Sequence, residues 1–265
     1  MTNSTDSSTG KGAVPILRAW DDESFYLGFV GRLGGASAGP YASMNLSQWV
    51  GDQSEAVDSN WEALKRELSV MGRVTTLNQT HGVEIHQITS GNAGERLSGD
   101  GMVTTEPGIA LGIFTADCVP ILMADKERRV IGALHAGWRG LVAGIVNSGL
   151  SSMNSLGART ANMQIAMGPS IGLCCFEVDA SLGERFAREI PGAVRHRRAG
   201  LPGKAYLDLR GIIKDQFESA GVELENIWSI GPCTKCESDK FFSRRAAGGR
   251  QTGLQLSFIG MKDAR

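Results

Sequence analysis

The sequence has no apolar run long enough to cross a bilayer and almost no net charge. A transmembrane helix needs about 20 consecutive apolar residues, and every apolar run here is shorter. The 27 basic and 28 acidic side chains leave a formal net charge of −1. Such a balance gives no bulk attraction to nucleic acid or to anionic membranes. We therefore expect neither a nucleic-acid partner nor a membrane association.

The start of the chain lacks the apolar segment of a secretory signal peptide. Residues 1–13 are rich in Ser, Thr and Gly, so we expect a disordered tail there and a single catalytic domain over residues 14–265. The chain has an odd number of cysteines, two of them adjacent: Cys118, Cys174, Cys175, Cys233 and Cys236. Without an export signal, this favours reduced thiols in a cytoplasmic protein over a disulfide framework.

The sequence also lacks an internal linker and a short repeat, so its strands and helices are expected to share one fold. Apolar residues at helical spacing predict helices in residues 52–70, 141–156, 180–189 and 209–220. Short apolar runs predict strands in residues 16–30, 74–77, 83–88, 109–115, 119–124, 129–134, 164–167, 227–231 and 254–259. Residues 90–101 look like a polar loop. Because strands and helices do not alternate evenly, the pattern favours an α+β sandwich over a doubly wound sheet.

Only four histidines are present, and two of them occupy similar positions. His81 and His135 each follow a predicted strand and have a glycine close behind, and Cys118 also follows an apolar strand. Two imidazoles and one thiolate suit Zn²⁺ and leave a fourth position for water or substrate. Water bound there would have a pKa of about 7 and could act as a nucleophile.

The spacing alone leaves other interpretations open. The three residues are 37 and 17 positions apart, which matches no local metal motif. A buried thiol beside two histidines bonded to backbone fits equally well. Alternatively, Cys118 is a nucleophile with His135 or His81 as its base, oriented by Asp117 or Asp100.

The other cysteines and histidines have simpler interpretations. Cys233 and Cys236 form a C-x-x-C pair with no second pair at zinc-finger spacing, so we interpret them as ordinary thiols. Cys174 and Cys175 follow a Gly-Pro-Ser-Ile-Gly turn and are interpreted as packing or loop residues. The two remaining histidines are expected to be a hydrogen-bonded strand residue and part of a solvated basic loop: His86 and His196.

Five motifs, taken in order, resemble one known family. They are residues 78–82, 99–104, 115–120, 135–140 and 168–178. They resemble the YfiH-like laccase-domain family, and the collinear match extends beyond them, from about Gly28 to about Ile259. Its members carry the names polyphenol oxidase, peptidoglycan editing factor and purine nucleoside phosphorylase. The resemblance implies a layered α/β/β/α sandwich with mixed sheets and a mononuclear zinc site on His81, Cys118 and His135.

The activity that the resemblance implies is cleavage of purine nucleosides by phosphate. Inosine, adenosine or methylthioadenosine would give the free base and ribose 1-phosphate, and adenosine would also be deaminated. The partners are thus purine nucleosides and phosphate, the cofactor is Zn²⁺ with Cu²⁺ as an alternative, and the assembly is a monomer or small homo-oligomer.

Site residues follow from the same motifs and from two further elements that resemble the family, residues 29–35 and the Phe-Phe-Ser-Arg-Arg motif at residues 241–245. The catalytic candidates are His81, Cys118, His135 and Asp117. The candidates for binding substrate or phosphate are Arg32, Gln79, Arg139 and Arg245. Arginine offers a bidentate fork to phosphate, although each arginine could instead be a structural ion-pair partner. Asp117 or Glu177 could carry protons, and Trp138 could either stack on the substrate or belong to the core.

The sequence leaves three alternative functions open. Copper-dependent phenol oxidation is disfavoured because multicopper chemistry needs more than four histidines. Cys118-dependent amide hydrolysis would suit the editing-factor name. A binding protein could use the same pocket for a nucleotide-like ligand without catalysis.

Overall fold

The computed structural model describes residues 14–20, 22–68 and 73–262, so the predicted N-terminal tail lies outside the described residues. The strands are β1 (Ile16–Leu17), β2 (Phe25–Val30), β3 (Arg73–Thr76), β4 (Ile85–Gln87), β5 (Gly101–Thr104), β6 (Ile109–Thr115), β7 (Val119–Asp125), β8 (Val130–Ala136), β9 (Met163–Met167), β10 (Glu177–Asp179), β11 (Arg197–Ala199), β12 (Lys204–Leu207), β13 (Ile227–Ser229) and β14 (Gln255–Met261). The α-helices are α1 (Ser54–Glu67), α2 (Trp138–Ala143), α3 (Ile145–Ser155), α4 (Ala180–Glu189) and α5 (Leu209–Ser219).

The strands form two large sheets and one small one. The first large sheet has the order β1-β2-β14-β6-β3, and the second has the order β13-β9-β7-β8-β5-β4. Most neighbours are antiparallel, but β3–β6, β4–β5 and β13–β9 are parallel. Both large sheets are therefore mixed, and the predicted α+β class is confirmed.

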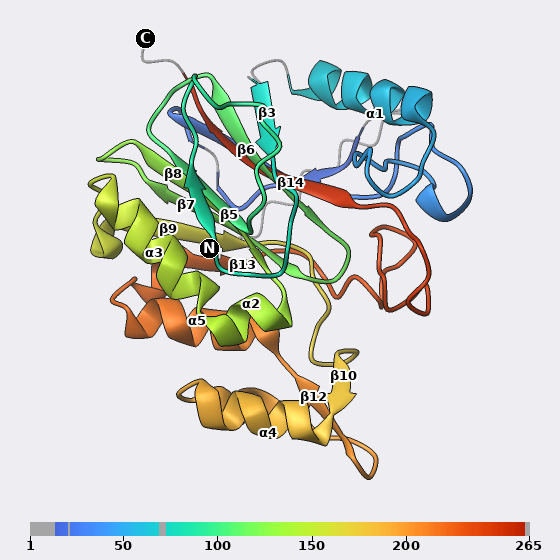
Figure 1. The fold of residues 1–265 in the computed structure, drawn as a ribbon, viewed down its shortest axis with the longest axis vertical. Helices are drawn as coiled ribbons and strands as arrows, with labels where there is room; N and C mark the ends of the chain where they lie inside the picture. Colours follow the sequence, from blue (N-terminus) through green and yellow to red (C-terminus); the bar gives the residue numbers. More distant parts are fainter. Residues whose placement is uncertain (1–13, 21, 69–72, 263–265) are drawn as a thin grey trace.

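Alternating side chains bury both faces of the two large sheets. In β6, Leu111 and Ile113 pack between the sheets against Leu122 of β7, whereas Phe114 points the other way, into the core that contains Leu64 of α1. The outer face of the second sheet packs against α3 and α5. The resulting order of helix, sheet, sheet and helices (Figure 1) is the expected layered sandwich.

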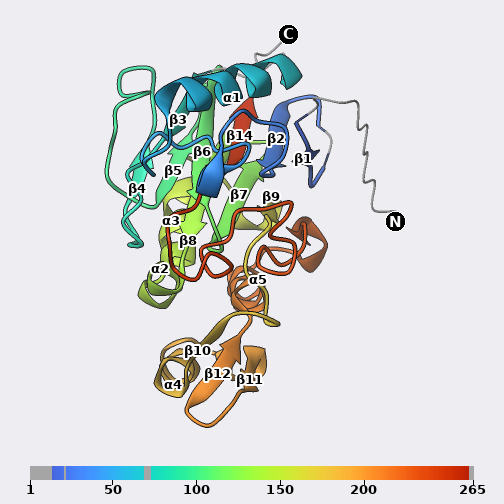
Figure 2. The same ribbon diagram turned by 90° about the vertical axis from the view of Figure 1, so that its right-hand side faces the viewer.

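A small lobe projects from the helical end of this sandwich. It consists of the three-stranded sheet β10-β12-β11 with α4 beside it (Figure 2). His196, just before β11, is half-buried, and its Nε2 lies 2.8 Å from Oδ2 of Asp215 in α5. The expectation of a solvated loop at His196 is therefore wrong, because the acid on α5 holds the side chain against the main body.

Three other details differ from or complete the sequence-based expectations. The helix predicted over residues 141–156 is two helices, because Gly144 has φ of 98° and interrupts the first at Ala143. The loop predicted over residues 90–101 runs into β5, whose four residues are all buried. His86 is bonded to the backbone oxygen of Ser98 at 2.8 Å, as expected for a strand histidine. No helix in the described ranges has the length and apolar character needed to cross a membrane.

Candidate metal centre

Three segments from different parts of the fold bring His81, Cys118 and His135 together. His81 follows β3, Cys118 lies in the link from β6 of the first sheet to β7 of the second, and His135 lies at the end of β8. One ligand atom from each residue lies within 4.8 Å of the other two. Sγ of Cys118 is 3.9 Å from Nε2 of His81, and the two imidazole rings meet edge to face with their centroids 4.7 Å apart.

The backbone is strained at two of these segments. His81 has φ of 63° and Asp117, next to Cys118, has φ of 102°. Residues other than glycine rarely adopt such φ angles, which cost about 1–3 kcal/mol each and occur most often at functional sites. These strained turns set the directions of the His81 and Cys118 side chains.

Asp100, directly before β5, supports the His81 and His135 segments through hydrogen bonds. Its Oδ1 accepts hydrogen bonds from Nδ1 of His135 at 2.7 Å and from the backbone N–H of His81 at 2.9 Å. Its Oδ2 accepts from the backbone N–H groups of Thr80 and Gly82 and from the Thr80 hydroxyl. With Nδ1 engaged, Nε2 of His135 is the nitrogen left for Cys118 or for a metal. A carboxylate behind a histidine is the usual support of a metal ligand.

The electrostatics favour a thiolate at Cys118. Burial opposes the charged form, but the charge on His135 and hydrogen bonds from His135 and His81 lower the pKa of Cys118 to about 6. Burial likewise opposes a charged His135, yet Cys118 and Asp100 raise its pKa to about 9. The pKa of the Asp100 carboxyl is lowered well below its usual range, because bonds from His135, Thr80 and Gly82 outweigh burial. The proton on Nε2 of His135 must leave before that nitrogen can bind a metal.

The glycines of the motif at residues 135–140 make room for these ligands. A Cβ on Gly137 would lie 2.8 Å from the His81 ring and 3.2 Å from Sγ of Cys118. A Cβ on Gly140 would lie 2.7 Å from the backbone oxygen of Gly82. The absence of side chains at both positions therefore lets α2 pack directly against the His81 loop.

These residues fit a metal ion. One sulfur and two imidazole nitrogens are donors that zinc and copper both accept. Three protein ligands leave a coordination position open, and the Asp100 bond fixes one ligand ring in advance.

Comparison with known proteins shows the family of the chain. Residues 26–262 match the family described as multi-copper polyphenol oxidoreductase laccase. The chain belongs to this family. It is 38% identical over 256 residues to the purine nucleoside phosphorylase of Deinococcus radiodurans, covering 94% of this chain and 93% of that protein.

Two solved structures have the same fold as this laccase-domain chain. YlmD from Geobacillus stearothermophilus has a TM-score of 0.87 at 31% identity, covering 96% of this chain and 98% of that one. The hypothetical protein YfiH of Bacillus licheniformis has a TM-score of 0.87 at 29% identity, covering 95% and 97%. The resemblance to the YfiH-like family is thereby confirmed.

Asp117 has a structural task in this laccase-domain site. Its Oδ1 accepts a hydrogen bond from the Thr234 hydroxyl at 2.6 Å, and its Oδ2 accepts one from the backbone N–H of Arg245 at 2.7 Å. Both oxygens thus tie the segment between β13 and β14 to the Cys118 turn.

The four residues predicted to bind substrate or phosphate differ in how far their polar groups are already hydrogen-bonded within the protein. The Gln79 amide is paired in both directions with the backbone of Phe114 in β6. The Arg245 guanidinium donates to the backbone oxygens of Cys175 and Glu177. Arg139, by contrast, is exposed and stacks on the Trp138 ring at 4.4 Å. Within the described part of the chain it has no ion-pair partner.

Arg32 lies in a different setting. Its guanidinium donates to the backbone oxygens of Ala42 and Ser238 and stacks on Phe242 at 4.8 Å. It also lines a cavity of 590 Å³ together with Ser243 and Arg250. This cavity is bounded by the C-terminal loop that follows residues 241–245.

Two features were not anticipated. Asp100 was considered only as one of two groups that might orient a base for Cys118, whereas here it supports both histidine segments. We also did not expect the ordinary thiols Cys233 and Cys236 and the loop residues Cys174 and Cys175 to lie in one cluster. The C-x-x-C spacing was the one local signal for that cluster.

Proposed function

We propose that the chain is a zinc-dependent purine nucleoside phosphorylase that also deaminates adenosine. The observation that carries the proposal is the convergence of His81, Cys118 and His135 on one point with a coordination position left open. It is supported by the similarity to a protein named purine nucleoside phosphorylase over most of both chains. Inosine, adenosine and methylthioadenosine would be the nucleosides.

Zinc is the metal we propose for this centre. A thiolate with two imidazoles is a common zinc donor set, and a chain with four histidines has too few for the several copper ions of a multicopper oxidase. When bound, zinc would supply a Lewis acid that lowers the pKa of water and polarises substrate groups. Asp100 would keep the proton on Nδ1 of His135 and so direct Nε2 toward the metal.

In phosphorolysis, a phosphate oxygen bonds to C1′ of the ribose as the bond from C1′ to the purine nitrogen breaks. The electron pair leaves with the purine, which takes up the proton that the attacking hydrogen phosphate loses. We assign Arg139 to the phosphate, because its guanidinium is exposed and free of ion pairs in the described residues. Arg245 and Arg32 give hydrogen bonds to backbone oxygens, so they would mainly shape the walls of the site, as would Gln79.

In deamination, water adds to C6 of adenosine and ammonia leaves, so one proton moves from the water to the departing nitrogen. Asp117 and Glu177 are the candidates for carrying it. Both oxygens of Asp117 already accept hydrogen bonds, whereas Glu177 accepts one from the Tyr206 hydroxyl at 2.9 Å. We therefore propose Glu177 for the proton and Asp117 for positioning Arg245 and Thr234.

Replacing Cys118 tests the proposal. Cys118→Ala removes the thiolate ligand, so the zinc ion of this centre and the phosphate-dependent release of hypoxanthine from inosine should both be lost. The melting temperature reports whether the variant is folded. Zinc is measured by elemental analysis and hypoxanthine by chromatography. Wild-type protein that releases no hypoxanthine from inosine in the presence of phosphate would overturn the proposal.

Amide hydrolysis by Cys118 is the second candidate. It is favoured by one observation: the thiol, with its pKa lowered to about 6, lies among His81, His135 and Asp100, an arrangement that also suits a cysteine nucleophile. A Cys118→Ala protein that holds as much zinc as wild type but loses amide hydrolysis would favour this candidate.

We also propose a cytoplasmic location and a monomer or small homo-oligomer. All five cysteines are free thiols, which fits a reducing compartment.

A further inference from the structure

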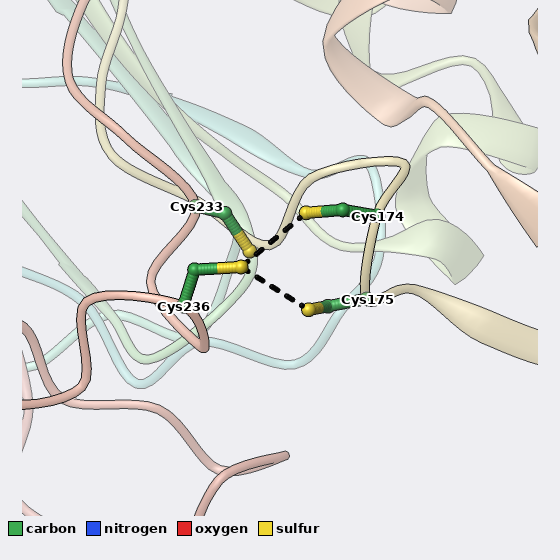
Figure 3. A group of neighbouring side chains, drawn as sticks. All are labelled: Cys174, Cys175, Cys233 and Cys236. Carbon is green, nitrogen blue, oxygen red and sulfur yellow. Dashed lines mark hydrogen bonds between the residues drawn. The ribbon is translucent and has the colours of Figure 1, made fainter.

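Four cysteine sulfurs gather outside the candidate metal centre. Cys174 and Cys175 lie in the turn between β9 and β10, and Cys233 and Cys236 lie in the segment between β13 and β14 (Figure 3). The four sulfur atoms all lie within 4.8 Å of one another. Sγ of Cys236 is 3.6 Å from Sγ of Cys174 and 3.5 Å from Sγ of Cys175. Two segments about 60 residues apart in the sequence thus present four thiols to one point.

The spacing of the sulfurs matches a tetrahedral ion better than a disulfide. Zn–S bonds of about 2.3 Å in a tetrahedron place neighbouring sulfurs about 3.8 Å apart. A disulfide would bring two sulfurs to about 2.0 Å. Cys174 and Cys175 are adjacent in the sequence, and the sulfurs of both lie close to that of Cys236. Cys236 could form a disulfide with only one of them.

The backbone around Cys233 favours a thiolate. The N–H of Gly172 donates to Sγ of Cys233 at 3.2 Å, and the N–H groups of Lys235 and Cys236 are also directed at it, so the pKa of Cys233 falls to about 7 although burial opposes this. N–H groups that converge on a sulfur support a metal ligand in the way that carboxylates support histidine ligands.

The other thiols are crowded. Burial and hydrogen bonds with neighbouring cysteines raise the pKa of Cys174 to about 11, and the pKa of Cys175 is raised further. Several thiolates cannot coexist at such distances unless a cation lies between them. A dication would replace the protons and reverse these shifts.

We propose that Cys174, Cys175, Cys233 and Cys236 bind a second zinc ion in a closed structural site. Four protein ligands leave no position for substrate, so the ion would have no part in catalysis. Binding releases a proton from each thiol that is protonated and leaves four sulfurs bonded to the metal, with no oxidation. Arg245, which donates to the backbone oxygen of Cys175 at 3.2 Å, and the exposed Lys235 would offset the negative charge of the four thiolates.

The ion would connect two segments that contact Asp117, the residue next to Cys118. Thr234, inside the C-x-x-C pair, donates its N–H to the oxygen of Ser170 and its hydroxyl to Asp117. Arg245 bonds to Asp117 and to both sides of the Cys175 turn. Through these contacts, a zinc ion at the cysteine cluster would fix the position of Asp117 without touching the substrate.

The zinc content of five proteins, purified without chelator and under reducing conditions, tests the proposal. Wild type should hold two zinc ions per chain. Cys118→Ala should hold one, and loading that folded variant with cobalt should give the absorption bands of a tetrahedral tetrathiolate. Cys236→Ser should lose one zinc ion, whereas Cys236→His should keep it because imidazole can replace a thiolate. Lys240→Ala, at an exposed lysine paired with Glu237, serves as the control and should keep both ions.

Three outcomes would overturn the proposal. Cys118→Ala protein that is folded but free of zinc would do so, as would folded Cys236→Ser protein that holds as much zinc as wild type. A mass two hydrogens lower, with a disulfide from Cys236 to Cys174 or Cys175, would point to a redox pair instead. The Cys118→Ala measurement does not depend on Cys236→Ser folding. It is also separate from the proposed phosphorolysis, since it reads zinc and not activity.

Discussion

At the level of single residues, Asp100 connects the two histidine segments. One fully buried carboxylate accepts hydrogen bonds from the His135 ring and from the backbone of residues 80–82. The His135 ring and the His81 turn therefore share one anchor. A change at Asp100 should affect both proposed ligands at once.

Asp100→Asn keeps the shape of the side chain but removes its charge. The amide nitrogen of asparagine would face N–H donors on one side, so the His81 turn and the His135 ring should both loosen. We expect zinc affinity to fall by about 10- to 100-fold, measured by competition with a chromogenic chelator. Asp179→Asn, at an exposed acid paired with Lys204, is the control and should bind zinc as wild type does. Equal affinity in the two variants would contradict the role assigned to Asp100.

Arg139→Ala should separate phosphate binding from folding. Its side chain is exposed and contacts the Trp138 ring, so its loss should change the free energy of unfolding by less than about 0.5 kcal/mol. A lost hydrogen bond to a charged group amounts to about 1.5–3 kcal/mol, so kcat/KM for phosphate should fall by about 10- to 100-fold. Arg198→Ala is the control, because Arg198 stacks on Tyr206 in the small lobe. If initial rates at varied phosphate give wild-type kcat/KM for Arg139→Ala, the anion binds elsewhere.

At the level of secondary-structure elements, the short helix α2 sets the position of the His81 turn. Gly140 faces the backbone of Gly82, whereas Gly144, at the end of the helix, faces no atom within 4 Å but has φ of 98°. Replacing either glycine with alanine should therefore destabilise the fold, but for a different physical reason in each case.

Gly140→Ala should weaken both folding and the metal site, because its Cβ would press on the Gly82 carbonyl and shift His81. Overpacking of this kind costs about 1–3 kcal/mol. Gly144→Ala should cost about 1–2 kcal/mol through its left-handed backbone and leave zinc content unchanged. Urea unfolding with elemental analysis measures both effects. Loss of zinc in Gly144→Ala alone would show that α2 does not set the turn.

The sequence predicted long buried elements better than short paired ones. The apolar runs of β6 and β7 are continuous because both faces of each strand are buried, so their limits were predicted to within a residue. The strands β10 and β11 have three residues each and exist only through pairing with β12, which no local pattern reveals. The meeting of His81, Cys118 and His135 could be expected from strand ends and from the family resemblance. The support by Asp100 and the cysteine cluster depend on loops that meet only in the folded chain.

At the level of the whole molecule, the small lobe is joined to the sandwich partly by charge. Asp215 of α5 lies 2.7 Å from Nη2 of Arg195 and 2.8 Å from Nε2 of His196. Burial would raise the pKa of Asp215, but the hydrogen bonds from His196 and Arg195 lower it below its usual value. The ionised carboxylate is therefore favoured more strongly in the folded state than in the unfolded state.

Asp215→Asn should lower the free energy of unfolding at pH 7 by up to about 1 kcal/mol. Because the folded pKa is depressed, the stabilisation is present above the unfolded pKa and is lost as the pH falls through the folded value. The difference between wild type and variant should thus shrink between about pH 5 and pH 2. Urea titrations across that range measure it, with Asp179→Asn as an exposed comparison. A difference that grows toward acid pH would contradict this assignment.

The place of β14 has a consequence for biosynthesis. This strand, residues 255–261, lies in the middle of the first sheet, where it pairs with β2 on one side and β6 on the other. When β2 and β6 have emerged from the ribosome but β14 has not, the edges of β2 and β6 that pair with β14 are still unpaired. Unpaired strand edges can form hydrogen bonds with other chains and lead to aggregation. The first sheet can close only after residue 261 has emerged. Ribosome-bound chains that stop before β14 should therefore depend on chaperones that shield exposed strands.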